Sequence, residues 1–211
     1  MKPIPKSGFY NTNNYGRIAL LSYEDVLGKG GLNAVLNLAS LSNLIDNYPP
    51  ANMEKAFDFA DYTAILVGLE ELYGPRGGRG LALRAGRSTF KDIIDNYGAM
   101  AGVTDLAFKV LPLGLKLRMG LSAAAKTFSE SSDQLTTLQD DNDTLTWTIH
   151  RCPSCWTRTG SDKPVCYVTI GFLQASLNWV SNGREFRVNE SKCCAMGDDV
   201  CEFLIQKEPV S

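Results

Sequence analysis

The order of secondary structure is clearest in the carboxy-terminal part of the chain, which runs CYVTIGFLQASLNWV at 166–180 and ESKCCAMGDDVCEF at 190–203. Apolar residues in the first stretch recur every three or four positions and predict a helix that ends at Gly183. Segments 185–190 and 200–206 have the composition of strands, and they predict a hairpin that closes the chain.

Another strand pair precedes this helix. Leu145, Trp147 and Ile149 alternate with threonines after a turn rich in Asp and Asn, which indicates a strand. Residues 135–138 are its predicted hairpin partner. The last third of the chain is therefore expected to fold as hairpin, helix, hairpin.

The first two thirds of the chain predict helices. Apolar runs with helical spacing, separated by glycine or proline, lie at about 18–27, 32–41, 62–72, 81–97, 101–110 and 113–128. The last run also fits a strand, because its leucines alternate from Leu113 to Leu117. We expect an α+β fold in which a helical amino-terminal part packs with a small antiparallel sheet. The predicted divisions are an extended arm at 1–16, a helical part at 17–133 and a metal-binding hairpin–helix–hairpin part at 134–211, within one structural domain.

All six cysteines follow residue 151, and their spacing resembles that of metal ligands. They are the CxxC pair Cys152 and Cys155, then Cys166, Cys193, Cys194 and Cys201, with Glu190 close to the last three. Thiolates and carboxylates are ligands of zinc. The amino terminus lacks the apolar core of a signal peptide, so we expect a cytoplasmic, reducing location where disulfides are rare. Plain buried thiols and thiol redox chemistry are the alternatives.

The motifs CYVTIGFL at 166–173 and ExxCxAMGDxxCxF at 190–203 resemble the 4-vinyl-reductase-type domain, a small-molecule-binding module. Related domains are the sensors of bacterial regulators that detect phenols and other aromatics. The helices around 73–87 also resemble stand-alone members, so the resemblance covers nearly the whole chain. It implies a ligand-binding fold similar to that of TRAPP vesicle-tethering subunits, usually homodimeric. It also implies a zinc ion held by Cys166, Glu190, Cys193 and Cys201.

The CxxC pair departs from the pattern of the sensors, which lack it. Cys152 and Cys155 could therefore replace Glu190 in an all-cysteine site, or remain free. Cys194 directly follows Cys193, and neighbouring residues of an extended chain point to opposite sides. We expect Cys194 to be structural.

The composition narrows the classes of function. With 21 basic and 23 acidic residues the net charge is −2, which gives no field to attract nucleic acid. No stretch of 18 apolar residues is present, so we expect no membrane span. The glycine-rich run at 74–80 lacks the Gly-Lys-Ser/Thr ending of a phosphate loop. His150 is the only histidine, so a Ser–His–Asp or Cys–His nucleophile would depend on it.

The leading hypothesis is a zinc-stabilised binding or sensing module, without an output segment of its own, that takes an aromatic or hydrocarbon molecule. The expected cavity lies between helices at 81–128 and the strand around Trp147. Candidate ligand-binding residues are Phe108, Phe128, Trp147, His150 and Tyr167. The alternatives are an accessory enzyme in tetrapyrrole vinyl reduction, as the family name suggests, and an iron–sulfur or thiol redox protein. No flavin motif and no Rossmann glycine motif supports catalysis by the chain alone.

Overall fold

A computed structural model describes residues 2–97 and 110–210 of the chain as an α+β fold. The helices are α1 (Asn13–Leu38), α2 (Phe59–Tyr97), α4 (Leu113–Ser131) and α5 (Tyr167–Val180), with short 3-10 turns at Ser42–Leu44 and Cys194–Met196. The strands are β1 (Tyr10–Thr12), β2 (Lys55–Asp58), β3 (Thr136–Asp140), β4 (Thr144–Ile149), β5 (Phe186–Lys192) and β6 (Cys201–Pro209). The helix expected at 101–110 lies outside the described residues. Within 2–97 and 110–210, no helix has both the length and the apolar character needed to cross a membrane.

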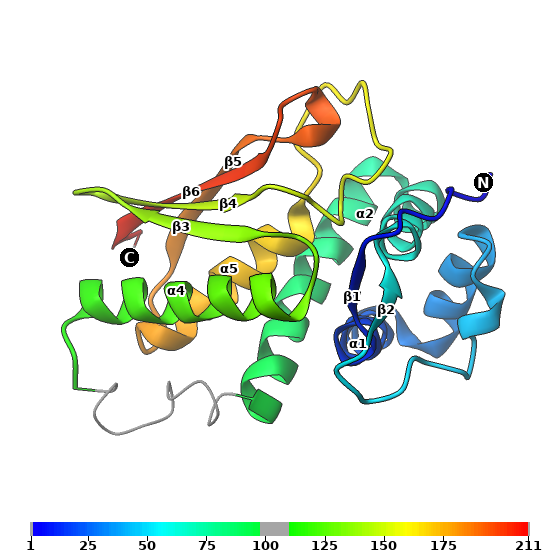
Figure 1. Cartoon of the computed structure of the whole chain (residues 1–211), viewed down its shortest axis with the longest axis horizontal. Coiled ribbons are helices and arrows are strands. Elements are labelled where there is room, and N and C mark those ends of the chain that lie inside the picture. The colour runs from blue at the N-terminus through cyan, green and yellow to red at the C-terminus, as the bar shows by residue number, and fades with distance from the viewer. Residues whose placement is uncertain (1, 98–109, 211) are drawn as a thin grey trace.

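An antiparallel sheet with the strand order β3–β4–β6–β5 dominates the carboxy-terminal part. Trp147 of β4 is in register with Phe203 of β6. Cys201, Phe203 and Ile205 are buried on one face, while Glu202 between them is only half-buried. Helices α4 and α5 lie beneath the sheet in Figure 1. Both predicted hairpins and the helix between them are confirmed.

Helices α1 and α2 each consist of two helical segments that meet at a glycine. Gly28 has φ 70° and Gly74 has φ 73°, and glycine adopts such angles without strain. The helix stops predicted at these two positions are confirmed. The turn predicted at 76–80 is wrong, because the chain there is helical. Pro75 fits the first turn of the new segment, where its missing N–H costs no hydrogen bond.

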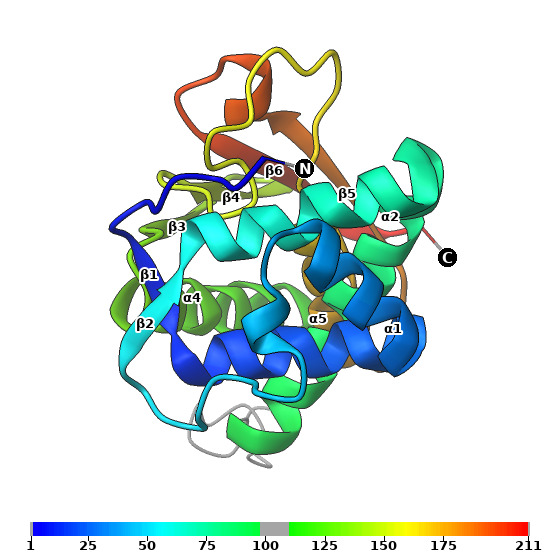
Figure 2. The same ribbon diagram turned by 90° about the vertical axis from the view of Figure 1, so that its right-hand side faces the viewer.

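The backbones of α2 and α5 touch where the two helices cross, behind α1 in Figure 2. A Cβ atom on Gly86 would lie 2.0 Å from the carbonyl oxygen of Val168. One on Gly171 would lie 2.0 Å from that of Leu83. Only glycine allows this approach, which fixes α5 firmly against the helical layer.

The segment that fitted either a helix or a strand forms helix α4. Its buried residues Leu117, Leu121 and Ala125 are spaced four apart on one face. They belong to the same core as Trp147 and the sheet, whereas α1 supplies a second core with the first half of α2. Helix α4, which the sequence groups with the helical part, thus packs with the sheet.

The amino-terminal segment is less extended than predicted. Helix α1 begins at Asn13, inside the expected arm, because the Thr12 side chain accepts a hydrogen bond from the Tyr15 amide at 3.2 Å and so caps the helix. Strands β1 and β2 pair as a two-stranded ribbon that the sequence did not predict.

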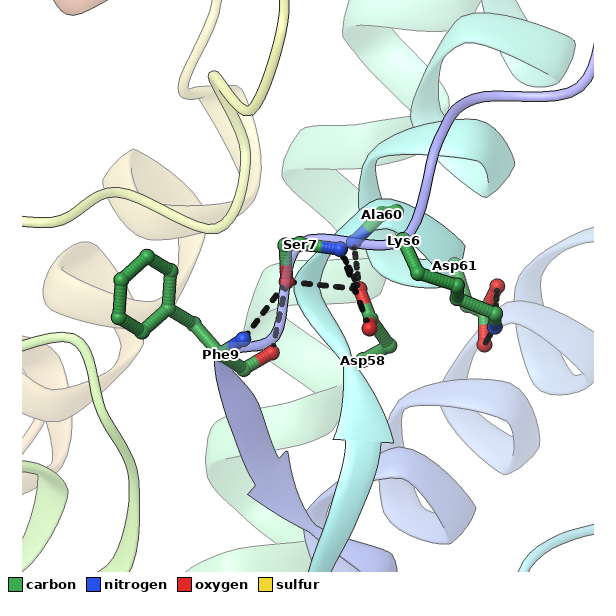
Figure 3. Close-up of polar contacts among 6 residues, drawn as sticks. All are labelled: Lys6, Ser7, Phe9, Asp58, Ala60 and Asp61. Carbon is green, nitrogen blue, oxygen red and sulfur yellow. Dashed lines mark hydrogen bonds and ion pairs between the residues drawn. The ribbon is translucent and has the colours of Figure 1, made fainter.

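Asp58, at the end of β2, fixes the segment that precedes this ribbon (Figure 3). It is 2% exposed, and its carboxylate accepts hydrogen bonds from the Ser7 amide at 3.1 Å, the Ser7 hydroxyl at 2.7 Å and the Ala60 amide at 2.7 Å. Burial acts to raise the pKa of Asp58, but these hydrogen bonds outweigh it and the pKa is lowered. Beside it, Lys6 forms an exposed ion pair with Asp61 at 2.5 Å.

Candidate metal centre and ligand cavities

Five buried cysteines converge where the two hairpins meet α5. Cys152 and Cys155 lie in the loop after β4, Cys166 immediately precedes α5, Cys193 follows β5, and Cys201 begins β6. The sheet register pairs Cys201 with Ile149, so the start of β6 lies beside the end of β4, from which the CxxC loop departs. The predicted hairpin–helix–hairpin order therefore gathers the thiols in one place, which we call the thiol cluster (Cys152, Cys155, Cys166, Cys193 and Cys201).

The sulfur atoms of the thiol cluster have the spacing of ligands around one ion. The Sγ–Sγ distances are 3.3 Å for Cys155–Cys166, 3.5 Å for Cys155–Cys193, 3.6 Å for Cys155–Cys201, 3.6 Å for Cys152–Cys166 and 3.7 Å for Cys166–Cys201. Thiolates bound tetrahedrally to zinc at about 2.3 Å lie about 3.8 Å apart. All six cysteines are free, so no disulfide occupies the cluster. The residues fit a tetrahedral metal ion.

Two groups of four donors lie close enough to share an ion. Within each group the donor atoms are within 4.8 Å of one another: Cys152, Cys155, Cys166 and Cys201 in the first, and Cys166, Glu190, Cys193 and Cys201 in the second. The second group is the set that the family resemblance implies, and the first is an all-cysteine alternative. Cys166 and Cys201 belong to both. The cluster thus offers more donors than one tetrahedral ion uses.

Glu190 carries an unsatisfied oxygen next to these thiols. It is 6% exposed, and its Oε2 accepts a hydrogen bond from the Cys166 amide at 3.0 Å. Its Oε1 is buried without a hydrogen-bond partner. Burial, and then the charge of Cys193, raise the pKa of Glu190 to about 9. A bound cation would satisfy the orphaned oxygen and remove the cause of this shift.

The loop between β5 and β6 positions the last two cysteines. The Cys193 amide donates to Oδ2 of Asp198 at 2.8 Å, and the Cys194 amide donates to Sγ of Cys201 at 3.4 Å. Gly197 turns the chain with φ 104°, a conformation that favours glycine. The half-buried thiol of Cys194 belongs to neither group of donors.

The two cysteines of the CxxC pair influence each other's ionisation. Contact with Cys155 raises the pKa of Cys152 to about 11. Contacts with Cys152 and Cys166 lower the pKa of Cys155. Each added thiolate disfavours the next, so a buried cluster of several thiolates requires a cation.

A separate, apolar cavity of about 360 Å³ lies between the helices. Residues of α1, α2, α4 and α5 line it, among them Ile18, Phe90, Leu121, Ala124, Phe172 and Trp179. The described lining has no charged side chain. Its polar members are confined to hydroxyl groups and one amide, such as Thr127 and Asn14. We call it the large cavity.

A second cavity, of about 30 Å³, lies between the large cavity and the CxxC loop, and we call it the small cavity. Tyr15, Phe128 and Phe172 line both cavities and so form the wall between them. Trp147 lines the small cavity, is 1% exposed, and its indole Nε1 has no hydrogen-bond partner. The volume is about that of one water molecule or one hydroxyl group.

The five predicted ligand-binding residues are placed differently from one another. Phe128 lines both cavities, and Trp147 lines only the small one, because the Phe128 ring covers its face at a centroid distance of 6.2 Å. His150 lines neither; it is exposed, and its Nε2 lies 3.2 Å from the Thr137 hydroxyl. Tyr167 lines neither, because Arg79 lies over its ring at 4.5 Å from the centroid. Phe108 is outside the described residues.

Sequence reasoning missed that α1 and α5 form walls of the large cavity. Ile18, Phe172 and Trp179 have ordinary core spacing, and no signal in a single sequence separates a cavity wall from a filled core.

Comparison with known proteins assigns the domain that contains the thiol cluster. Residues 145–207, from β4 through most of β6, match the family model of the vinyl-4-reductase domain, the same 4-vinyl-reductase-type domain that the motifs resemble. Uncharacterized protein MJ0150 of Methanocaldococcus jannaschii is 22% identical over 169 residues, which cover 80% of this chain and 87% of that protein. Uncharacterized protein MJ0855 of the same organism is 33% identical over 79 residues, covering 37% of this chain and 30% of that protein. The chain therefore carries a 4-vinyl-reductase-type domain.

Solved H-NOX structures share the fold. A structure concerned with heme distortion in the H-NOX family aligns with a TM-score of 0.61 at 13% identity, covering 95% of this chain and 97% of that one. The Fe(II) unliganded H-NOX protein from K. algicida aligns with a TM-score of 0.58 at 15% identity, covering 93% and 96%. At these identities the likeness establishes the fold alone.

The large cavity does not fit a heme. Its described lining contains no histidine and no cysteine to ligate iron. Burial raises the pKa of Tyr15, so its phenol stays protonated and is a poor iron ligand. The thioether of Met53 is at the rim, where the residue is 60% exposed.

Proposed function

We propose that this protein is a binding or sensing module whose large cavity takes a neutral, mostly apolar small molecule. The cavity itself supports the proposal: its volume of about 360 Å³ falls in the range of ligand pockets, and the described lining carries no charge. A close-packed core of this size would not leave such a space unless something occupied it.

A single polar contact is available to orient the ligand. The unpartnered indole N–H of Trp147 faces the small cavity, just beyond the Phe128 ring. A ligand oxygen that reached past Phe128 would accept its hydrogen bond. The ligand chemistry that fits best is therefore an aromatic or hydrocarbon body with one hydroxyl or carbonyl group.

Apolar burial should supply most of the affinity. At about 25 cal/mol per Å², a ligand that fills the large cavity should reach roughly −8 kcal/mol, which corresponds to a Kd of about 1 µM. Because no charge has to be neutralised, binding should depend only weakly on salt.

Calorimetric titration with 2-naphthol, a neutral bicyclic alcohol, tests this proposal. Ala124→Phe places a ring in the cavity and should weaken binding at least tenfold. Lys126→Phe adds the same ring two residues on, where the side chain is 75% exposed, and should bind like the wild type. Equal binding by all three proteins, or no binding of any neutral aromatic or hydrocarbon, would exclude the cavity as the site.

We further propose that the thiol cluster holds a structural zinc ion through Cys166, Glu190, Cys193 and Cys201. The donor spacing and the orphaned Oε1 of Glu190 support this set. The ion would tie the start of α5 to the closing hairpin. Zinc content of Glu190→Gln and Cys155→Ser separates the two donor groups: loss only in the first variant supports the set with Glu190, and loss only in the second supports the all-cysteine set.

An iron–sulfur cluster is a weaker candidate for the same thiols. Inorganic sulfide and several iron ions separate the cysteines of such a cluster, whereas sulfur distances of 3.3–3.7 Å suit a single ion. A colourless purified protein would exclude it. Homodimer formation and a cytoplasmic location stay predictions, and light scattering that returns the monomer mass would reject the dimer.

A further inference from the structure

The four-residue loop Cys152–Cys155 has one side on each site. Its two end residues point their thiols into the cluster, where Cys155 Sγ lies 3.3 Å from that of Cys166 and Cys152 Sγ lies 3.6 Å from the same atom. Its two middle residues, Pro153 and Ser154, line the small cavity. A loop this short has no slack between the two sites.

The loop is held in place by few contacts outside the cluster. The Cys155 amide donates to the Cys152 carbonyl at 3.2 Å, which closes the turn. The buried Thr63 hydroxyl donates to the Pro153 carbonyl oxygen and joins the loop to α2. Ser154 is 2% exposed, so a shift of the loop changes the wall of the small cavity rather than the protein surface.

The other cluster donors have no such position. Glu190, Cys193 and Cys201 contribute no lining to either cavity and are not adjacent to lining residues. Cys166 lies two residues before Val168, which lines the small cavity, but α5 is fixed there by its backbone contact with Gly86. The CxxC loop is thus the adjustable connection.

We propose that the Cys152–Cys155 loop links metal binding to small-molecule binding. An ion in the thiol cluster draws the two loop thiols to it and sets the position of Pro153 and Ser154, which shapes the small cavity for the oxygen atom of the ligand. The linkage is reciprocal: each ligand raises the affinity for the other by the same factor. This inference rests on the proposed binding function and adds its regulation.

Calorimetry with 2-naphthol measures the linkage directly. We expect zinc-loaded protein to bind 2-naphthol about tenfold more tightly than chelator-treated protein, within the usual range of coupling between sites. We also expect saturating 2-naphthol to raise the zinc affinity by the same factor in a competition with a chromophoric chelator. In the double variant Cys152→Ser, Cys155→Ser, loaded with zinc on the remaining donors, zinc and chelator-treated forms should bind 2-naphthol equally.

A pair of valine substitutions tests the loop without removing a cluster donor, in case the chelated protein unfolds. Thr63→Val releases the Pro153 carbonyl and should weaken both zinc and 2-naphthol binding severalfold. The matched variant Thr89→Val alters a buried threonine that lines the small cavity but bonds within its own helix, to Ala85. It should weaken 2-naphthol binding and leave the zinc affinity unchanged.

The outcomes separate this inference from the function beneath it. Equal 2-naphthol affinity with and without zinc in the wild type, or a Thr63→Val variant that keeps its zinc affinity, overturns the linkage and leaves the cavity as a binding site. Absence of 2-naphthol binding in every form overturns both proposals.

Discussion

Two buried polar sites of this chain are completed in different ways. Asp58 is 2% exposed, and its carboxylate accepts hydrogen bonds from Ser7 and Ala60. The thiol cluster is buried as deeply, with Cys166, Cys193 and Cys201 at 0% exposure, but its donors face mainly one another.

The difference indicates what each site needs from outside the chain. A buried acid is tolerated only with a partner, and Asp58 obtains its partners from the backbone and one serine. Cations close to the cluster in sequence are already paired, Lys192 with Glu202 and Arg158 with Glu70. The first site is self-sufficient, and the second requires an ion.

The largest effect expected from this comparison follows loss of a shared thiol. Cys201→Ser removes a donor of both groups, so the metal should be lost and the melting temperature should fall by about 10 °C or more, because binding energy at a structural site is folding energy. Elemental analysis and thermal unfolding measure both. Cys194→Ser, next to the cluster but in neither group, should keep its metal. Full metal content in Cys201→Ser would remove the distinction between the two sites.

A smaller effect is expected at the self-sufficient site. Asp58→Asn exchanges an acceptor for an amide whose NH₂ group would face the same donors, and it should lower the free energy of unfolding by about 2 kcal/mol. Metal content should not change. The control Asp61→Asn alters the exposed pair with Lys6 and should cost less than about 1 kcal/mol. Urea unfolding measures these differences, and loss of metal in Asp58→Asn would show that the sites are not independent.

The smallest effect is a dependence on pH. The pKa of Asp58 is lower in the folded chain than in the unfolded chain, so its contribution to stability is present above the ordinary aspartate pKa of about 4. That contribution is lost as the pH falls through the lowered value. The difference in unfolding free energy between the wild type and Asp58→Asn should therefore shrink as the pH falls below about 4. A constant difference would mean that the carboxylate charge does not matter.

Much of the fold could be predicted because its signals are local. Alternating apolar residues around Trp147 and helical spacing from Cys166 onward gave both hairpins and α5, and Gly28 and Gly74 marked real ends of helical segments. The β1–β2 ribbon could not be predicted, since Tyr10 pairs with Asp58 across most of α1 and carries no local sign of it.

The two candidate sites differ in the same respect. The cluster donors were identified from residue type and spacing, because thiols separated by short loops around one helix have few ways to be apart. The cavity depends on which apolar residues fail to fill space, so the contribution of Ile18 and Phe172 became visible only in three dimensions. His150 stood out by its chemistry alone and lies on the surface.

The central claim is that the thiol cluster is incomplete without a metal ion. Native mass spectrometry of the purified wild type, combined with its melting temperature before and after chelation, tests it most directly. The account predicts one zinc ion per chain and a chelated protein that melts at a much lower temperature and recovers when zinc is restored. A metal-free protein that melts at the same temperature with and without zinc would contradict it.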